Sequence, residues 1–115
     1  MRETIENFNT QFAFEPEIQN GAHFKKYSKF IVAGMGGSHL AADLIKTWKP
    51  DFDVAVHSDY GPLALADSQA KDTLVILSSY SGNTEETLDA LKDALSRGLP
   101  VAAISVGGKL LEAAK

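Results

Sequence analysis

Residues 74–88 read Leu74-Val-Ile-Leu-Ser-Ser-Tyr-Ser-Gly-Asn-Thr-Glu-Glu-Thr-Leu88, and this stretch decides the fold. An apolar, β-branched run passes into small hydroxyl residues and then into an amphipathic helical pattern, which predicts a strand, a loop and a helix. Because a helix start carries unpaired N–H groups and a partial positive charge, hydroxyls and a glycine there favour a phosphate site. The candidate phosphate ligands are Ser79, Ser81, Thr84 and the N–H groups around Gly82 and Asn83.

This loop differs from the loops that bind nucleoside triphosphates. It lacks a lysine, and nothing in the chain matches the G-x-x-x-x-G-K-[ST] pattern. The sequence therefore favours a phosphorylated small molecule over ATP.

Length and composition limit the classes of protein to consider. The 115 residues are 44% hydrophobic and 23% charged, which is typical of one globular domain. With a net charge of −4 and no basic cluster beyond Lys25-Lys26, we expect no nucleic-acid surface. The absence of cysteine excludes disulfides and thiolate metal sites, and the spacing of the three histidines predicts no metal site. With no apolar stretch near the ~20 residues of a membrane span, we expect no membrane partner and a cytoplasmic protein.

Two segments are expected along the chain. Residues 1–28 form a helical lead-in, in which Ile5, Phe8 and Phe12 make one apolar stripe before Pro16 and Asn20-Gly21 interrupt it. Residues 29–115 form the main domain, with strands expected over 30–33, 54–56, 73–78 and 101–106 and a helix beginning near 109.

Two helices of this domain show apolar stripes that we assign to the core. Their members are Leu40, Leu44, Ile45 and Trp48 in the first helix, and Leu88, Leu91 and Leu95 in the second. Pro50 marks the end of the first helix. Arg97 in the last turn, Gly98 and Pro100 mark the end of the second.

Strands separated by single helices predict parallel pairing through right-handed crossovers. The fold class is therefore α/β, a parallel sheet with helices on both faces. Ligands of such sheets bind at the carboxyl ends of the strands, where two loops lie: residues 34–38, hereafter the glycine loop, and residues 79–84, hereafter the serine loop. We expect the two loops to converge on one ligand.

The glycine loop, Gly34-Met35-Gly36-Gly37-Ser38, has three interpretations. Contact with a phosphorylated ligand is favoured over a tight turn. A dinucleotide fingerprint is incomplete, because His39 replaces its third glycine and neither Asp53 nor Asp59 falls cleanly at the end of the second strand. Ser38 has an alternative role as a helix N-cap. His39 either acts on a substrate oxygen or faces solvent.

The serine loop also has a purely structural interpretation. In it Ser81 or Asn83 caps the following helix, while Glu85 and Glu86 complement the helix dipole. Capping accounts for one polar residue but not for four, so phosphate binding is favoured. Glu85 and Glu86 are interpreted as dipole partners and not as catalytic bases.

With these motifs in place, the chain resembles the sugar isomerase (SIS) domain family, and most closely the N-terminal part of bifunctional phosphoglucose/phosphomannose isomerases. The resemblance rests on Gly34-Met-Gly-Gly-Ser38, on Ser79-Tyr-Ser-Gly-Asn-Thr-Glu-Glu-Thr87 and on Gly107-Gly108-Lys109-Leu110, in that order and spacing.

The resemblance implies a five-stranded, Rossmann-like, three-layer sandwich that binds a phosphosugar. By the resemblance, Ser38, Ser79, Ser81 and Thr84 bind the phosphate, and Gly36, Gly37, His39 and Asn83 lie beside the substrate. His39 and Leu40 depart from the glycine-rich continuation of many members. The isomerases use a glutamate, a histidine, a lysine and an arginine beyond the fourth strand, so we expect a chain that stops before its catalytic residues.

The leading hypothesis is a sugar-phosphate-binding portion of an aldose–ketose isomerase that interconverts glucose 6-phosphate or mannose 6-phosphate with fructose 6-phosphate through a cis-enediol, without metal or nucleotide cofactor. The alternatives are a non-catalytic regulatory phosphosugar-binding module and a dinucleotide-binding fragment. We also expect a homodimer, because an unfinished sheet leaves an open edge and apolar surface.

Overall fold

The computed structural model describes residues 2–7, 13, 15, 17–19, 21 and 25–114. In chain order its elements are α1 (Arg2–Glu6), β1 (Lys29–Ala33), η3 (Gly36–His39), α2 (Leu40–Trp48), β2 (Val54–His57), η4 (Asp67–Asp72), β3 (Thr73–Ser78), α3 (Glu85–Ser96), β4 (Val101–Ile104) and α4 (Gly108–Ala114), where η denotes a short 3-10 helix. The four strands and the three helices of the main domain are confirmed. The fourth strand ends at Ile104, two residues earlier than predicted.

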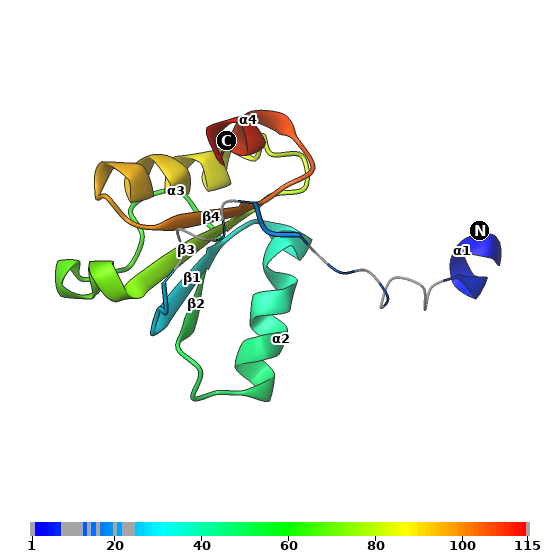
Figure 1. Ribbon diagram of the computed structural model, residues 1–115, viewed down its shortest axis with the longest axis horizontal. Helices are drawn as coiled ribbons and strands as arrows, with labels where there is room; N and C mark the ends of the chain where they lie inside the picture. Colours follow the sequence, from blue (N-terminus) through cyan, green and yellow to red (C-terminus); the bar gives the residue numbers. More distant parts are fainter. Residues whose placement is uncertain are drawn as a thin grey trace.

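The four strands form one parallel sheet in the order β2-β1-β3-β4. Figure 1 shows α2 on one face of the sheet and α3 and α4 on the other. The predicted α/β class with helices on both faces is therefore confirmed. Since the chain leaves β1 and β3 toward opposite faces, the carboxyl ends of these neighbouring strands form the switch point where such folds bind ligands.

The core lies between the sheet and the α3–α4 layer. Its buried side chains come from β1, β3, α3, the two connections that precede β3 and β4, and α4: Ile31, Ala33, Leu63, Val75, Leu77, Ala90, Ala94, Leu99 and Leu110. Val75 and Leu77 are fully buried, as expected for a central strand covered on both faces.

The apolar stripe of α2 was assigned to the core, and this prediction is wrong. Its members are exposed: Leu40 by 57%, Leu44 by 63%, Ile45 by 42% and Trp48 by 77%. The residue of α2 that is buried is Ala42. A small side chain lets the helix lie close to the sheet, and the stripe then faces outward, where none of the described residues covers it.

The stripe of α3 is partly corrected. Its buried positions are Thr87, Ala90 and Ala94, while Leu88 and Leu91 pack at the margin of the core and Leu95 is 61% exposed. The predicted C-terminus is confirmed, because α3 ends at Ser96 and Gly98 adopts a φ of 66°.

The lead-in stays largely a prediction. Ile5 in α1 is 69% exposed, and Phe8, Phe12, Pro16 and Asn20 lie outside the described residues. Within the described part of the chain, no helix is both long and apolar enough to cross a membrane.

Candidate functional site

The glycine loop and the serine loop meet at the switch point of the sheet. The last register pair of β1 and β3 is Ala33 with Leu77, so both loops begin at adjacent positions. A Cβ atom on Gly34 would lie 2.9 Å from the Ser78 carbonyl oxygen and 3.2 Å from the Ser38 Cβ. Only glycine permits this approach, so the glycine loop lies against the strand end from which the serine loop begins, while the convergence of the two loops on one ligand stays a prediction.

The serine loop is held by its own hydroxyl groups. The Ser79 Oγ accepts a hydrogen bond from the Gly82 N–H at 3.1 Å and lies 2.8 Å from the Thr84 Oγ1, with which it shares a second hydrogen bond. Ser79 is only 1% exposed. It therefore forms the base of the loop and maintains its shape.

Two other residues of the loop are exposed. The Ser81 Oγ accepts a hydrogen bond from the Asn83 N–H at 3.1 Å, and both side chains lie at the surface. Thr84 is half-buried between them and the base of the loop. The four predicted polar residues are thus brought together, with Ser79 inside and Ser81 outside.

The helix after the serine loop begins without a side-chain cap. Its N-cap is Thr84, whose side chain makes no capping hydrogen bond, so neither Ser81 nor Asn83 caps the helix as the structural interpretation required. The first N–H groups of a helix have no partner within it. The start of α3 therefore presents donors and a positive partial charge at the switch point.

The turn between β4 and α4 fixes the serine loop from its other side. The N–H groups of Val106, Lys109 and Leu110 donate to the Tyr80 carbonyl at 3.2 Å, the Asn83 Oδ1 at 3.1 Å and the Gly82 carbonyl at 2.9 Å, respectively. The start of α4 is therefore used to hold the loop. The sequence signals the turn through Gly107-Gly108, but it does not reveal this contact.

The glycine loop continues into a short 3-10 helix. Ser38 lies within it, half-buried, and its N–H donates to the Met35 carbonyl; it is not the N-cap of α2. His39 is that N-cap, and its Nδ1 lies 2.5 Å from the Asp43 Oδ2. Gly36 and Gly37 are exposed, with open space where a Cβ would lie.

The two acids weighed for a dinucleotide site make local contacts. Asp53 pairs with Lys29 at 3.3 Å, and the Asp59 Oδ1 accepts the Tyr60 N–H at 2.8 Å. In the part of the chain that the structure covers, no group of three or more metal-binding side chains occurs.

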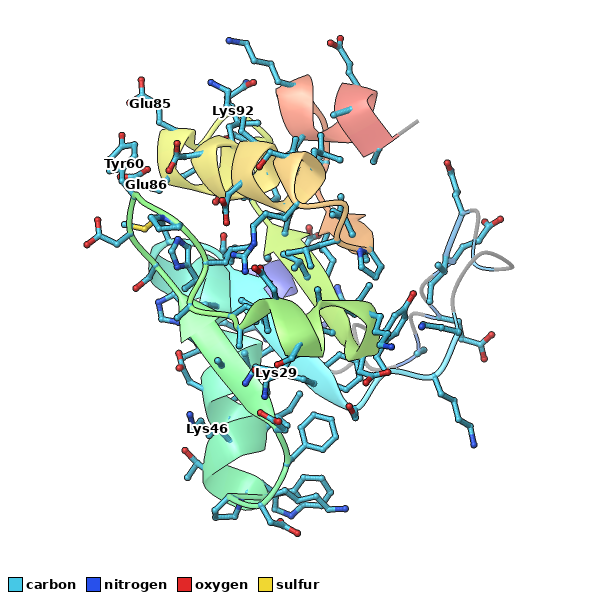
Figure 2. The ribbon with its side chains drawn as sticks, turned by 90° about the vertical axis from the view of Figure 1, so that its left-hand side faces the viewer. Lys29, Lys46, Tyr60, Glu85, Glu86 and Lys92 are labelled. Carbon is cyan, nitrogen blue, oxygen red and sulfur yellow. The ribbon has the colours of Figure 1, made fainter. Side chains whose placement is uncertain are left out.

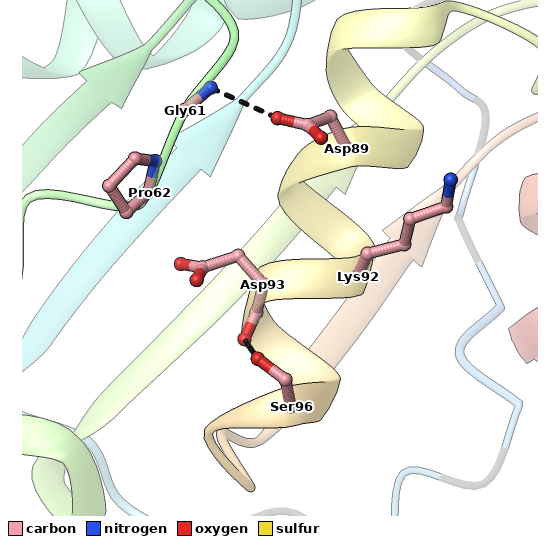
Figure 3. A pocket seen from close by; sticks show the side chains of 6 residues that line it. All are labelled: Gly61, Pro62, Asp89, Lys92, Asp93 and Ser96. Atoms are coloured by element: carbon pink, nitrogen blue, oxygen red, sulfur yellow. Dashed lines mark hydrogen bonds between the residues drawn. The ribbon is translucent and has the colours of Figure 1, made fainter.

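A segment that the sequence did not single out lies against α3. Residues 60–65, hereafter the strap, are held by acidic side chains spaced four residues apart on the helix. The Glu85 Oε2 accepts the Tyr60 hydroxyl at 2.9 Å, the Asp89 Oδ2 accepts the Gly61 N–H at 3.0 Å, and the Asp93 Oδ2 accepts the Leu63 N–H at 2.9 Å. An open groove of about 430 Å³ lies between the strap and α3 (Figure 3).

Arg97 completes this arrangement at the end of α3. Its guanidinium donates to the carbonyl oxygens of Leu63 at 3.0 Å and Leu65 at 2.5 Å, and it also contacts Asp93 at 3.3 Å. The spacing of Glu85, Asp89, Asp93 and Arg97 is visible in the sequence as one edge of a helix. Its partner, the strap, is not.

The hydroxyl of Tyr60 is held in its protonated form. The hydrogen bond to Glu85, together with partial desolvation and the charges of Glu85, Glu86 and Asp89, raises the pKa of Tyr60 from 10.0 to about 12. Figure 2 shows Tyr60, Glu85 and Glu86 grouped at one end of α3.

This pKa has a measurable consequence. Since the folded pKa lies above the unfolded value, the contribution of Tyr60 to stability is present below pH 10 and is lost as the pH rises toward 12. We expect the ultraviolet titration difference between the chain and its Tyr60→Phe variant to have a midpoint near 12, and Glu85→Gln to move that midpoint toward 10. A midpoint near 10 in the unmodified chain would contradict the Tyr60–Glu85 contact.

A solved structure shares this fold. A provisionally assigned phosphosugar isomerase from Clostridium difficile 630 matches the fold with a TM-score of 0.59 and 23% identity, over 96% of this chain and 30% of that one. No protein-family model matches the chain. The chain is thus an α/β protein with a parallel sheet that shares the fold of this solved structure.

Curated relatives identify the family. Bifunctional phosphoglucose/phosphomannose isomerases from Caldicellulosiruptor bescii, Pyrobaculum aerophilum and Aquifex aeolicus are 46%, 36% and 36% identical over 76%, 92% and 96% of the chain. The chain belongs to the bifunctional phosphoglucose/phosphomannose isomerase family. It spans 26%, 33% and 34% of the length of these three relatives.

Proposed function

We propose that the chain is the sugar-phosphate-binding portion of an aldose–ketose isomerase that interconverts glucose 6-phosphate or mannose 6-phosphate with fructose 6-phosphate. Family membership supports the reaction class. The observation that carries the binding role is the uncapped start of α3, which follows the serine loop directly, while the glycine loop contacts the end of β3 at the switch point of the sheet. These are the donors and the position that a phosphate group requires.

Of the four residues assigned to phosphate binding, which are Ser38, Ser79, Ser81 and Thr84, we propose Ser38, Ser81 and Thr84 as direct ligands. Ser81 is exposed and Thr84 half-buried, so their hydroxyls supplement the N–H groups of the α3 start. Ser79 contributes through the shape that it gives the loop.

The sugar is proposed to lie beside the glycine loop. Gly36 and Gly37 have no side chain to obstruct it. His39, which follows the glycine loop, and Asn83 of the serine loop are proposed to lie beside the sugar. The isomerisation proceeds through a cis-enediol with a general base and needs no metal or nucleotide cofactor. We assign the base to no residue of this chain.

We further infer that the protein acts as a homodimer in the cytoplasm, where phosphorylated sugars are metabolised. Exposed apolar side chains support the association, among them Leu44, Trp48, Ile104 and Val106. Such surface is typical of protein contacts.

Calorimetric titration with fructose 6-phosphate tests the binding role. We expect binding that Ser81→Ala weakens about tenfold, because a hydrogen bond to a charged group contributes about 1.5 kcal/mol. Ser96→Ala is the matched control: it removes an exposed serine hydroxyl at the far end of α3 and leaves the affinity unchanged. Equal binding of unphosphorylated fructose, or an unchanged affinity in Ser81→Ala, would refute the phosphate assignment.

A further inference from the structure

The proposed phosphate site lies next to an acidic helix edge. Glu85 is the first residue of α3 and follows Thr84 directly, and Asp89 and Asp93 continue the same edge along the helix. A carboxylate beside a bound phosphate raises the energy of the complex, because like charges repel. Phosphate binding is therefore stronger when these carboxylates, and above all that of Glu85, point away from the phosphate.

A residue of the strap, Tyr60, orients the Glu85 carboxylate. The Glu85 Oε2 accepts the hydrogen bond of the Tyr60 hydroxyl at 2.9 Å, so this carboxylate is turned toward the strap. Figure 2 shows both side chains at the same corner of the molecule. A carboxylate that accepts a hydrogen bond from a fixed donor loses the freedom to approach a second anion.

The backbone of the strap around Tyr60 is held by hydrogen bonds to acidic side chains. Its N–H donates to Asp59 at 2.8 Å, and the next residue, Gly61, donates to Asp89 at 3.0 Å (Figure 3). Farther along, Leu63 is bound by Asp93 and by Arg97. These contacts fix the backbone from which the Tyr60 side chain extends to Glu85.

Building on the proposed sugar-phosphate site, we propose that the strap sets the phosphate affinity of the serine loop, with Tyr60 as a positioning residue that holds the Glu85 carboxylate away from the bound phosphate. Tyr60 acts through Glu85 and does not contact the phosphate. Removal of its hydroxyl leaves the Glu85 side chain charged and free to turn toward the bound phosphate.

A double-mutant cycle on the full chain, titrated with fructose 6-phosphate, tests the inference. Tyr60→Phe is expected to weaken binding about fivefold at low salt. Glu85→Gln alone changes the affinity less than about twofold, because the carboxylate is already directed away. Glu85→Gln in the Tyr60→Phe background restores the affinity, since it removes the charge. Added salt also reduces the deficit of Tyr60→Phe, because it screens exposed charges.

Two controls separate positioning from loss of structure. Tyr27→Phe removes the hydroxyl of a tyrosine that precedes the amino end of β1, whereas both loops follow the carboxyl ends of their strands, and it should leave the affinity unchanged. Thermal unfolding of each variant reports any loss of folded protein. A merely structural role of Tyr60 predicts that the double variant binds no better than Tyr60→Phe and that salt does not reduce the deficit.

The outcomes also separate this inference from the proposed function. Binding by the unmodified chain together with an unchanged affinity of Tyr60→Phe would overturn the positioning role alone. Absence of fructose 6-phosphate binding by the folded, unmodified chain would overturn the proposed function and this inference with it.

Discussion

Gly82→Ala is expected to lower the free energy of unfolding by about 4 kcal/mol and to abolish binding of fructose 6-phosphate, because steric overlap and left-handed backbone strain act at the same residue. Gly82 has a φ of 75°, and a Cβ atom there would lie 1.7 Å from the Gly107 carbonyl oxygen. The opposing atom is backbone of the β4–α4 turn, so no side-chain rotation relieves the overlap. Urea denaturation measures the loss of stability.

Gly98→Ala is the matched control for this substitution. Gly98 also has a positive φ, 66°, but no atom lies within 4 Å of its added Cβ. It should cost about 1 kcal/mol, the price of the backbone conformation alone. A similar loss for the two variants would show that the contact between the serine loop and the β4–α4 turn is not formed.

Arg97→Met is expected to destabilise the chain by about 3 kcal/mol, because it leaves partly buried polar groups without their partner. Methionine keeps much of the apolar length of the side chain but donates no hydrogen bond to the carbonyl oxygens of Leu63 and Leu65. The arginine side chain is only 21% exposed, so water replaces these bonds poorly. Urea denaturation measures the stability, and hydrogen exchange of the Leu63 amide reports the release of the strap.

Arg2→Met tests whether this effect comes from burial or from charge. Arg2 forms an ion pair with Glu6 at 2.7 Å, with its own side chain 91% exposed. Such a pair contributes about 0.5 kcal/mol or less. Equal effects of Arg97→Met and Arg2→Met would contradict the role of Arg97 in holding the strap.

Much of the fold could be predicted because its signals are local. The β-branched run at 74–77 and the Arg97-Gly98-x-Pro100 ending define β3 and the end of α3 within a few residues. The strand–loop–helix order then requires parallel pairing, which places the glycine loop and the serine loop at one edge of the sheet. Both inferences use only the local pattern and the order of the elements, and neither requires knowledge of which distant side chains touch.

The errors arose where periodicity alone was used to choose the buried face. The spacing of Leu40, Leu44 and Trp48 identifies an apolar face of α2, but the sheet receives Ala42. Periodicity shows that a helix has two faces, and the element packed against it decides which of them is buried. In α3 the same effect shifts the buried positions to Thr87, Ala90 and Ala94.

The candidate site divides in the same way. Ser79, Ser81, Asn83 and Thr84 are neighbours in the sequence, so their gathering in one loop followed from local chemistry. Which of these side chains is buried and which is exposed could not be predicted locally, because Ser79 is buried by the loop that it stabilises.

By itself, the sequence determined the α/β class, the parallel order of strands and helices, and the two loops that meet at the sheet edge. The tertiary structure alone decided the outward face of α2, the α4 contact that holds the serine loop and the strap on the acidic edge of α3, because each joins residues that are far apart in the chain.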